Sequence, residues 1–373
     1  MRIGIVGGGI IGLALGWRLR REGLEVVVFE RDRAGARTSY VGAGMLAPYA
    51  EVGFEELPLM RLGEQSLNLF PAFLDRLAED AGRVPRLDRC GTLMVGVDRD
   101  DTEHLRRLYD FRRELGLPVE MITGTEARER EPLLAPRVVS AIWLPDDAQI
   151  DNRLLVAALR EAFLRRGGRL LEGTAVQRVL VEGDRVRGVQ TAAETHPLDA
   201  VVVAAGCWSG QVPGLPEALR PPVRPVKGQI LTLGVDPACR LTRMIRSPRV
   251  YLVPKEEGTI RLGATTEEKG FDTEPTAGAV KELLEDAWEV VPCIYDLPVR
   301  EVLAGLRPAS RDHAPIIGQA GLEGLYYATG HYRNGILLTP VTVENLAAEI
   351  VFGTIPESTR PFRPERFQTH PTP

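Results

Sequence analysis

Several protein classes are excluded by what this sequence lacks. Its 373 residues carry 46 lysines and arginines against 51 aspartates and glutamates, so no excess of basic charge exists to hold nucleic acid or an anionic membrane surface. No stretch reaches the roughly 18 uninterrupted apolar residues of a membrane-spanning helix. Glycines interrupt the apolar run at 3–17, which is therefore not typical of a signal peptide. We expect a globular, cytoplasmic protein whose partners are small molecules, without nucleic acid or membrane.

Cysteine is scarce, and its spacing excludes the usual cysteine sites. The four cysteines form no CxxC pair and have no close histidine, so zinc, iron–sulfur and dithiol redox sites have no support. They are Cys90, Cys207, Cys239 and Cys293. We therefore expect no bound metal, and reduced structural thiols as in a cytosolic protein.

The first thirty residues have the pattern of a strand–helix–strand unit. An apolar strand is expected at 2–6, a helix at 10–22 and a strand of β-branched residues at 25–29. Residues 7–12 read GGGIIG and fit the GxGxxG fingerprint directly between strand and helix. That context is typical of an adenine dinucleotide site.

Three glycines and one carboxylate of this unit have separate expected roles. Gly7 permits the tight turn, Gly9 lets backbone N–H groups approach a pyrophosphate at the helix N-terminus, and Gly12 lets the helix lie close to the strand. Glu30 lies at the end of the second strand, where its carboxylate can accept hydrogen bonds from ribose hydroxyls. The unit does not separate NAD from FAD, because both present the same ADP half.

The next segment favours the longer cofactor. Residues 37–45, RTSYVGAGM, carry hydroxyls and small side chains instead of a regular helix–strand alternation. Such a segment suits a loop pressed against a long cofactor, although a glycine-rich surface loop is the alternative.

The rest of the chain alternates helices and strands before it becomes rich in strands. Helices are expected at 67–81, 101–115, 151–168, 276–290 and 335–352. Strands are expected at 91–97, 169–172, 176–181, 185–191, 198–205, 228–233, 249–254, 259–264, 299–305 and 325–329. The proline-rich segment 216–225 indicates a crossing between domains, and 358–373 is expected to be a loose tail.

Several further motifs resemble the flavin-dependent D-amino acid oxidase superfamily and, within it, the glycine oxidases. They are AGMLAP at 43–48 followed by Glu51, VVAAGCWS at 202–209, PVKGQ at 225–229, YLVP at 251–254, GAT at 263–265, GLRPASRD at 305–312 and HYRNGILL at 331–338. The first of these is the more specific marker of the glycine oxidases. The motifs occur in order over nearly the whole chain.

The resemblance implies an α/β fold with two domains. A discontinuous, Rossmann-like FAD-binding domain is expected at 1–85, 143–215 and 301–373. A smaller substrate-binding domain with an antiparallel sheet is expected at 86–142 and 216–300.

The resemblance also implies the residues that contact FAD. Besides Gly7, Gly9 and Gly12 they are Ile10, Ile11, Glu30, Arg31, Thr38, Ser39, Ala43, Gly44, Met45, Val176, His331, Tyr332, Arg333, Asn334, Gly335, Ile336 and Leu337. Gly335 is expected to begin a long apolar helix whose positive end faces the pyrimidine edge of the flavin. Val176, at the start of a strand, could frame the adenine, although it could equally be a core valine.

For the substrate, the resemblance implies a carboxylate clamp. A guanidinium can grip a carboxylate through two parallel charge-assisted hydrogen bonds, and Arg307 matches the family's clamp. Its apolar surroundings, LAGLRPA, distinguish it from a solvated surface arginine. Arg333 and Tyr251 match the helpers, but could also be a solvated loop residue and a core tyrosine. No catalytic acid or base is expected, because flavin N5 accepts the hydride. His313 and His331 are expected to be structural.

Two departures and one missing residue refine this expectation. Arg249 stands where family members can carry a histidine, and Thr266 replaces what can be a methionine over the flavin. No cysteine follows Cys293, so the attachment position of the sarcosine oxidase branch is empty and FAD is expected to be noncovalent.

The expected activity is the oxidative deamination of glycine and related small amines, such as sarcosine and small D-amino acids. The imine product would hydrolyse to glyoxylate or supply thiazole synthesis for thiamine, while O2 is reduced to H2O2. The alternatives are a D-amino acid dehydrogenase with a quinone acceptor, a nonenzymatic dinucleotide-binding protein and an NAD-dependent dehydrogenase. By analogy with the family, a homo-oligomer, namely a homotetramer, is expected.

Overall fold

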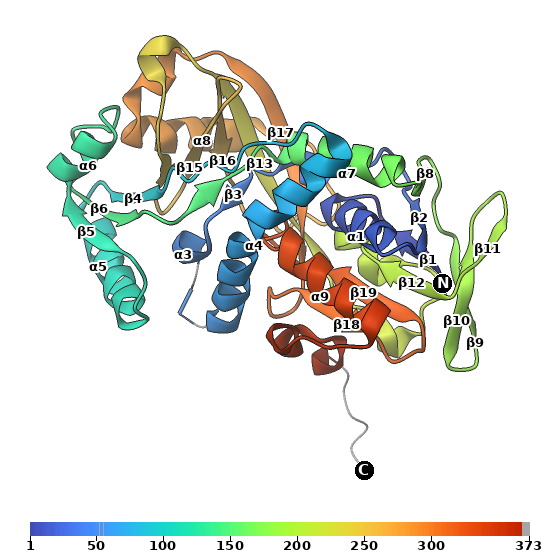
Figure 1. Cartoon of the computed structure of the whole chain (residues 1–373). Coiled ribbons are helices and arrows are strands. Elements are labelled where there is room, and N and C mark those ends of the chain that lie inside the picture. Colours follow the sequence, from blue (N-terminus) through green and yellow to red (C-terminus); the bar gives the residue numbers. More distant parts are fainter. Residues whose placement is uncertain (52, 55, 368–373) are drawn as a thin grey trace.

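Two large β-sheets organise the chain in the computed structural model, which describes residues 1–51, 53–54 and 56–367 (Figure 1). The first has six strands in the order β18-β19-β12-β1-β2-β8 and is parallel except for the pair β18 and β19. Its strands are β1 (Arg2–Val6), β2 (Glu25–Phe29), β8 (Arg169–Leu171), β12 (Ala200–Val203), β18 (Ile316–Gln319) and β19 (Leu325–Thr329).

Four helices pack together with one face of this sheet and enclose an apolar core. They are α1 (Ile10–Arg21), α4 (Leu57–Ala81), α7 (Asn152–Arg165) and α9 (Thr339–Phe352). Trp17, Phe70, Phe73 and Phe163 are fully buried between them. A second core lies on the other side of the sheet, towards the small antiparallel sheet of β9 (Arg178–Glu182), β10 (Arg185–Gln190) and β11 (Thr195–Pro197).

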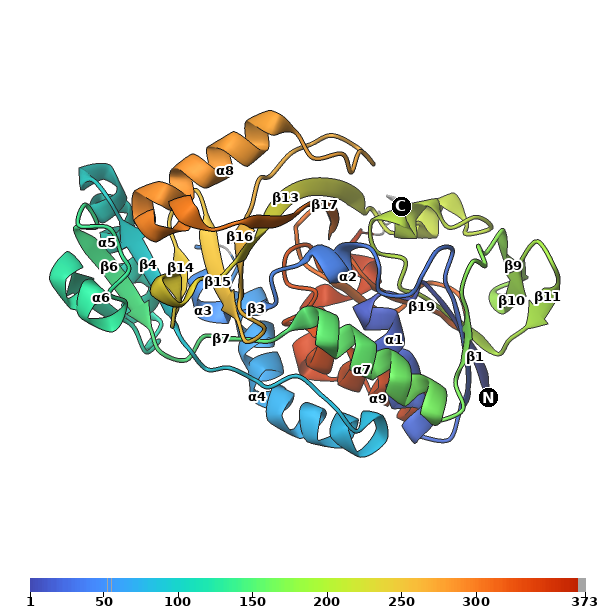
Figure 2. The ribbon, with the colours of Figure 1, turned by 90° about the horizontal axis from the view of Figure 1, so that it is seen from above.

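The second large sheet has eight strands in the order β17-β13-β16-β15-β14-β4-β6-β5 and is antiparallel except for the pair β14 and β4. Its strands are β4 (Thr92–Gly96), β5 (Glu120–Thr123), β6 (Ser140–Leu144), β13 (Arg224–Gly234), β14 (Met244–Arg246), β15 (Tyr251–Lys255), β16 (Thr259–Gly263) and β17 (Val299–Ala309). Figure 2 shows α8 (Ala277–Val290) lying along this sheet, with α5 (Arg99–Glu114) and α6 (Gly124–Arg130) at its far end.

Short elements join the two sheets. They are α2 (Thr38–Val41), β3 (Met45–Leu46), α3 (Pro48–Glu51) and β7 (Ala148–Gln149). Helix α2 contacts both α7 and β17, and β3 pairs with β7. The segment expected to lie against a long cofactor therefore runs between the sheets.

The strand–helix–strand unit at the N-terminus is confirmed, and so are the expected starts of two helices. Asp151 caps α7 by accepting a hydrogen bond from the backbone N–H of Leu154 at 2.8 Å. Thr276 caps α8 in the same way. These side chains satisfy backbone donors that the first turn of a helix leaves without partners.

Several element boundaries differ from the expectation. Helix α4 begins at Leu57, ten residues early, and α9 begins at Thr339, because residues 335–338 form turns rather than helix. Val176 precedes β9 instead of starting it. Strands β5, β6 and β14 and helix α6 were not expected. Most of them are too short to show a clear period.

The C-terminal segment is ordered where the structure describes it, so the expectation of a loose tail is wrong for 358–367. Two 3₁₀ helices, Glu357–Phe362 and Pro364–Phe367, cover β18. Phe362 is 3% exposed, and burying this ring explains why the segment stays on the sheet. The remaining tail residues, 368–373, lie outside the described part of the chain.

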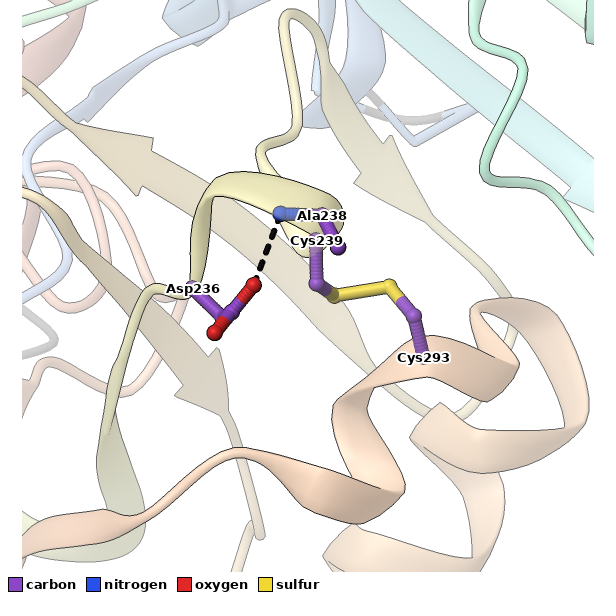
Figure 3. Close-up of a disulfide and its surroundings, with 4 residues drawn as sticks. All are labelled: Asp236, Ala238, Cys239 and Cys293. Atoms are coloured by element: carbon purple, nitrogen blue, oxygen red, sulfur yellow. Dashed lines mark hydrogen bonds between the residues drawn. A yellow bond between two sulfur atoms is a disulfide. The ribbon is translucent and has the colours of Figure 1, made fainter.

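The expectation of four reduced thiols is wrong for one pair, because Cys239 and Cys293 form a disulfide (Figure 3). Each lies in a 3₁₀ helix, Pro237–Cys239 and Pro292–Asp296, and their Cα atoms are 5.7 Å apart, within bridging range. Pairs 54 residues apart in sequence are not recognisable from spacing alone. Cys90 and Cys207 are free and buried.

The two sheets support the proposed division into a cofactor part and a substrate part, with one shift. Strand β17 pairs along its length with β13, so a boundary at residue 301 would cut through a strand. We propose that this boundary lies near residue 310. Within the described ranges, no helix is both long and apolar enough to cross a membrane.

Candidate active site

A cavity of about 550 Å³ lies between the two sheets. Its walls are the loop after β1, the segment 30–45, the residues facing it from β13, β14, β15 and β17, and the segment 328–337. Both the volume and the mixture of apolar walls with a few polar groups are typical of a cofactor site.

Of the residues predicted for the site, all but Gly12 line this cavity. They are Gly7, Gly9, Ile10, Ile11, Glu30, Arg31, Thr38, Ser39, Ala43, Gly44, Met45, Val176, Tyr251, Arg307 and the whole segment from His331 to Leu337. Arg249 and Thr266 line it as well. Residues far apart in the sequence thus converge on one space.

The three fingerprint glycines differ in what surrounds them. A Cβ on Gly12 would overlap the carbonyl oxygen of Gly7, and Gly7 itself has a φ of +112°. Both glycines are therefore required by packing and backbone conformation. A Cβ on Gly9, at the N-cap of α1, would meet only the Ser39 Oγ at 3.5 Å. The space beside Gly9 belongs to the cavity and forms a cradle that a larger side chain would fill.

This cradle is suited to a pyrophosphate. The first N–H groups of a helix have no partners within the helix and attract anions. Ile10 donates its N–H to Ser39 Oγ at 3.0 Å, which ties the segment 37–45 to the helix start. Thr38 Oγ1 donates to the carbonyl of Leu306 at 2.7 Å and ties the same segment to β17. The residues present fit the adenine dinucleotide that the sequence predicts.

Glu30 shapes the next part of the cavity. Its carboxylate accepts hydrogen bonds from the backbone N–H groups of Gly8 and Asp32, both at 2.8 Å. Nearby, the guanidinium of Arg31 lies 4.7 Å from the ring centre of Trp208, which also lines the cavity. Contact between Glu30 and a ribose stays a prediction.

Arg307 enters the cavity from β17. Its guanidinium lies directly over Gly228, where any Cβ would overlap both terminal nitrogens. Nη1 donates to the carbonyl oxygens of Thr265 at 3.0 Å and Lys227 at 3.4 Å. With the carboxylates of the described residues it makes no ion pair. A cation held by carbonyls and open to a cavity is well placed to bind an anionic ligand.

Tyr251, like Arg307, lies over a glycine of a neighbouring strand. A Cβ on Gly263 would come within 2.5 Å of the Tyr251 hydroxyl, so the missing side chain makes room for this ring. Burial raises the pKa of Tyr251, and the charges of Arg307 and Arg246 oppose that rise. Tyr251 therefore stays protonated and can donate a hydrogen bond into the cavity.

The guanidinium of Arg333 already has carboxylate partners within the protein. Its Nε lies 2.9 Å from Glu51 Oε2 and its Nη2 lies 3.1 Å from Glu56 Oε2. Arg333 is therefore paired already, and its role as a helper stays a prediction. Arg249 is held at the cavity by Asp286 and Glu289, each at 2.8 Å.

The sequence missed Arg246 as a site residue. It lines the cavity from the last position of β14 and forms an ion pair with Glu51. Burial lowers the pKa of Arg246 to about 10, and the charge of Arg333 adds to this effect. It stays charged at neutral pH. No sequence signal singled it out, because β14 is only three residues long.

His331 has the structural role that the sequence favours. Its Nε2 is hydrogen-bonded to Thr342 Oγ1 at 3.0 Å. Burial lowers its pKa to about 3, so the ring is neutral at working pH. His313 has a φ of +57° and stacks on Tyr332 at 4.6 Å. In the part of the chain that the structure describes, no cluster of three or more His, Cys, Asp or Glu could hold a metal ion.

Residues 335–338 form a turn, so the positive N-terminal end of α9 lies further along the chain than expected. Because α9 begins at Thr339, Gly335 does not start the helix. The turn is held by the N–H of Leu338, which donates to the Asn334 carbonyl at 2.8 Å. Gly335, Ile336 and Leu337 still line the cavity, but as a loop in front of the helix.

Fold and cavity together indicate a dinucleotide-binding protein, and comparison with protein families shows that its class is an oxidoreductase. The chain belongs to the FAD dependent oxidoreductase family, whose model matches residues 2–349. It is therefore an FAD-dependent enzyme. That the cradle at Gly9 holds the pyrophosphate of the cofactor stays a prediction.

Individual relatives narrow the resemblance. The chain is 34% identical to the glycine oxidase of Geobacillus kaustophilus over 91% of its own length and 90% of that protein. A crystal structure of glycine oxidase from Geobacillus kaustophilus superposes with a TM-score of 0.91, at 33% identity and full coverage of both chains. This chain is also 34% identical to the bifunctional protein ThiO/ThiG of Trichormus variabilis. The match covers 93% of this chain but only 52% of that protein. The chain thus spans about half the length of this last relative.

Replacing Gly228 by alanine should displace the Arg307 guanidinium without unfolding the protein. The new Cβ would occupy the space of the Arg307 guanidinium, which is the flexible end of a long side chain and can move. We expect KM for glycine to rise about tenfold or more, with the FAD content unchanged. Steady-state kinetics and the flavin absorbance of the purified variant test this. Equal KM values would contradict the placement of Arg307.

Proposed function

We propose that this chain catalyses the oxidative deamination of glycine and related small amines, with O2 as the electron acceptor. The observation that carries the proposal is the Arg307 guanidinium. It opens into the cavity that contains the dinucleotide cradle, and it is held by two carbonyl oxygens instead of a carboxylate.

The side chains account for substrate binding and exclusion of water. Arg307 binds the substrate carboxylate, and the Tyr251 hydroxyl donates a second hydrogen bond to it. Ile230, Met45 and Leu337 supply apolar wall around the rest of a small substrate. When bound, FAD supplies the acceptor for the Cα hydrogen and its electron pair and passes the electrons on to O2.

Positioning is the main contribution of the protein in this proposal. A neutral amine needs no side chain as a base in this reaction, because the Cα hydrogen leaves as a hydride. His331 is hydrogen-bonded to Thr342, and burial lowers its pKa, so it is a poor base. Holding the carboxylate fixes the Cα hydrogen relative to the cofactor, and such positioning can supply a large part of the rate.

The similarity to proteins named glycine oxidase over nearly their full length supports this substrate class. The name ThiO/ThiG supports a supply of product to thiazole synthesis for thiamine. The alternative of a quinone-dependent D-amino acid dehydrogenase has no better support. Membership of an oxidoreductase family disfavours a nonenzymatic binding protein.

The direct test is a product assay with the FAD-loaded protein. Glycine, sarcosine, D-alanine and D-proline are supplied separately in air, and the oxo acid and H2O2 are measured. Equal amounts of both products from glycine are expected. Turnover only with an added quinone would favour the dehydrogenase.

Acid denaturation should release all of the flavin. Cys90 and Cys207 are buried and do not line the cavity, and Cys239 and Cys293 are bonded to each other. None is placed for a covalent bond to the cofactor. Precipitated protein should therefore leave its yellow colour in the supernatant, and colour in the pellet would contradict noncovalent binding.

The cytoplasmic location and the homotetramer stay predictions. The bifunctional relative also leaves open which further domains accompany this activity. Light scattering of the purified FAD-loaded chain measures its mass directly, and a mass of four chains would support the tetramer.

A further inference from the structure

A row of residues across the eight-stranded sheet places a second arginine in the cavity. Arg246 on β14 is opposite Tyr251 on β15, Tyr251 is opposite Gly263 on β16, and Gly263 is opposite Ile230 on β13. Residues directly opposite one another on neighbouring strands point to the same face of the sheet. Arg246, Tyr251 and Ile230 all line the cavity accordingly.

Tyr251 therefore lies between two guanidinium groups. The charges of both Arg307 and Arg246 act on its hydroxyl. Arg307 lies on the side of Tyr251 that faces β13, over Gly228, and Arg246 lies on the other side, on β14. Both arginines line the same cavity, so a ligand bound beside Tyr251 has a cation on either side.

The two arginines differ in how their charge is balanced. Arg307 makes no ion pair within the described ranges, whereas Arg246 pairs with Glu51. Glu51 also pairs with Arg333, so one carboxylate serves two guanidinium groups. The remaining donors of Arg246 are available to an anion in the cavity, since its side chain is still 25% exposed.

We propose that Arg246 is a specificity-determining residue that binds a second acidic group of the substrate. The preferred substrates are then amino acids whose amine nitrogen carries a substituent with a second carboxylate. An example is N-(carboxymethyl)glycine, which is iminodiacetate. Arg307 binds the first carboxylate and Arg246 binds the second. The proposal rests on the proposed function and extends it to a class of substrates.

Such a diacid carries a carboxylate at each end. It can therefore place one carboxylate on each side of Tyr251, where Arg307 and Arg246 lie. Arg249 is not an equivalent second site, because Asp286 and Glu289 already occupy its guanidinium. It provides a matched control, an arginine at the same cavity whose charge is balanced.

Binding of dead-end ligands tests the proposal without turnover. Diglycolate has an ether oxygen in place of the amine and cannot be oxidised as an amine, and its monoamide has the same size with one carboxylate fewer. Both are titrated into the FAD-loaded protein and followed by the flavin spectrum. We expect diglycolate to bind on the order of tenfold to a hundredfold more tightly than the monoamide.

Substitutions assign that preference to Arg246. Arg246→Met should bring the ratio of the two dissociation constants close to one, and Arg246→Lys should restore part of it. Arg249→Met should leave the ratio as in the parent. Glu51→Gln should raise it, because Arg246 loses its competing carboxylate. Flavin content verifies that each variant is folded.

Turnover separates failure of this inference from failure of the proposed function. The parent should oxidise iminodiacetate with a higher kcat/KM than its monoamide, and Arg246→Met should lose this difference. If glycine and sarcosine are oxidised but the diacid preference is absent, or does not depend on Arg246, the inference alone is overturned. If none of these amines reduces the flavin, the proposed function fails as well.

Discussion

Replacing Arg307 by alanine is expected to lower kcat/KM for glycine on the order of 30-fold to several-thousand-fold. The reason is the loss of a charge-assisted contact with the substrate carboxylate, which costs about 2 to 5 kcal/mol. Because the guanidinium touches carbonyl oxygens and the cavity, the fold should tolerate its removal. Steady-state kinetics with glycine over a wide concentration range measure the effect.

Two controls identify the clamp as the cause. Arg307→Lys should recover only part of the loss, because an ammonium group cannot reproduce the planar fork of donors. Amines without a carboxylate should lose far less than glycine does, and the flavin spectrum should stay nearly unchanged. Glycine turnover within twofold of the parent would contradict the clamp, and Arg333 would then become the leading candidate.

Replacing Gly9 by valine is expected to abolish most FAD binding while leaving a folded protein. A Cβ on Gly9 would meet only Ser39 Oγ, at 3.5 Å, so the valine side chain should not clash with the protein. It would instead occupy the cradle for the pyrophosphate. We expect FAD to bind on the order of 100-fold more weakly, a loss of about 3 kcal/mol. The absorbance of the purified protein and titration with FAD measure this.

Gly12 provides the matched control, because its side chain would meet protein and not cofactor. A Cβ there would overlap the Gly7 carbonyl, so Gly12→Ala should reduce thermal stability as well as FAD content. Glu30→Ala should only weaken FAD binding and leave the backbone N–H groups of Gly8 and Asp32 without their acceptor. A fully yellow Gly9→Val protein would contradict the assignment of the cradle.

Local patterns predicted the cofactor half of the site. Gly7, Gly9, Glu30 and the segment 37–45 are close in sequence. They line one cavity because the turn after β1 and the end of β2 adjoin in the parallel sheet. The starts of α7 and α8 were also predicted, since a helix start depends on a few consecutive residues. Arg307 was found through the motif that surrounds it.

Contacts between distant strands could not be predicted. Arg246 reaches the cavity because β14 pairs with β15, and Glu51 reaches it from a short helix near the N-terminus. Gly228 and Gly263 leave room for the side chains of Arg307 and Tyr251, a role that depends on strand register alone. The disulfide between Cys239 and Cys293 likewise depends on packing that local sequence does not encode.

We propose that this FAD-dependent chain takes electrons from glycine and gives them to O2. Mixing the FAD-loaded protein with glycine in the absence of oxygen and recording the visible spectrum tests this proposal most directly. We expect glycine to bleach the flavin, admission of air to restore the yellow colour, and H2O2 to form in the same amount as flavin was reduced. A flavin that stays oxidised with glycine, or stays bleached in air, would contradict glycine oxidation with O2 as the acceptor.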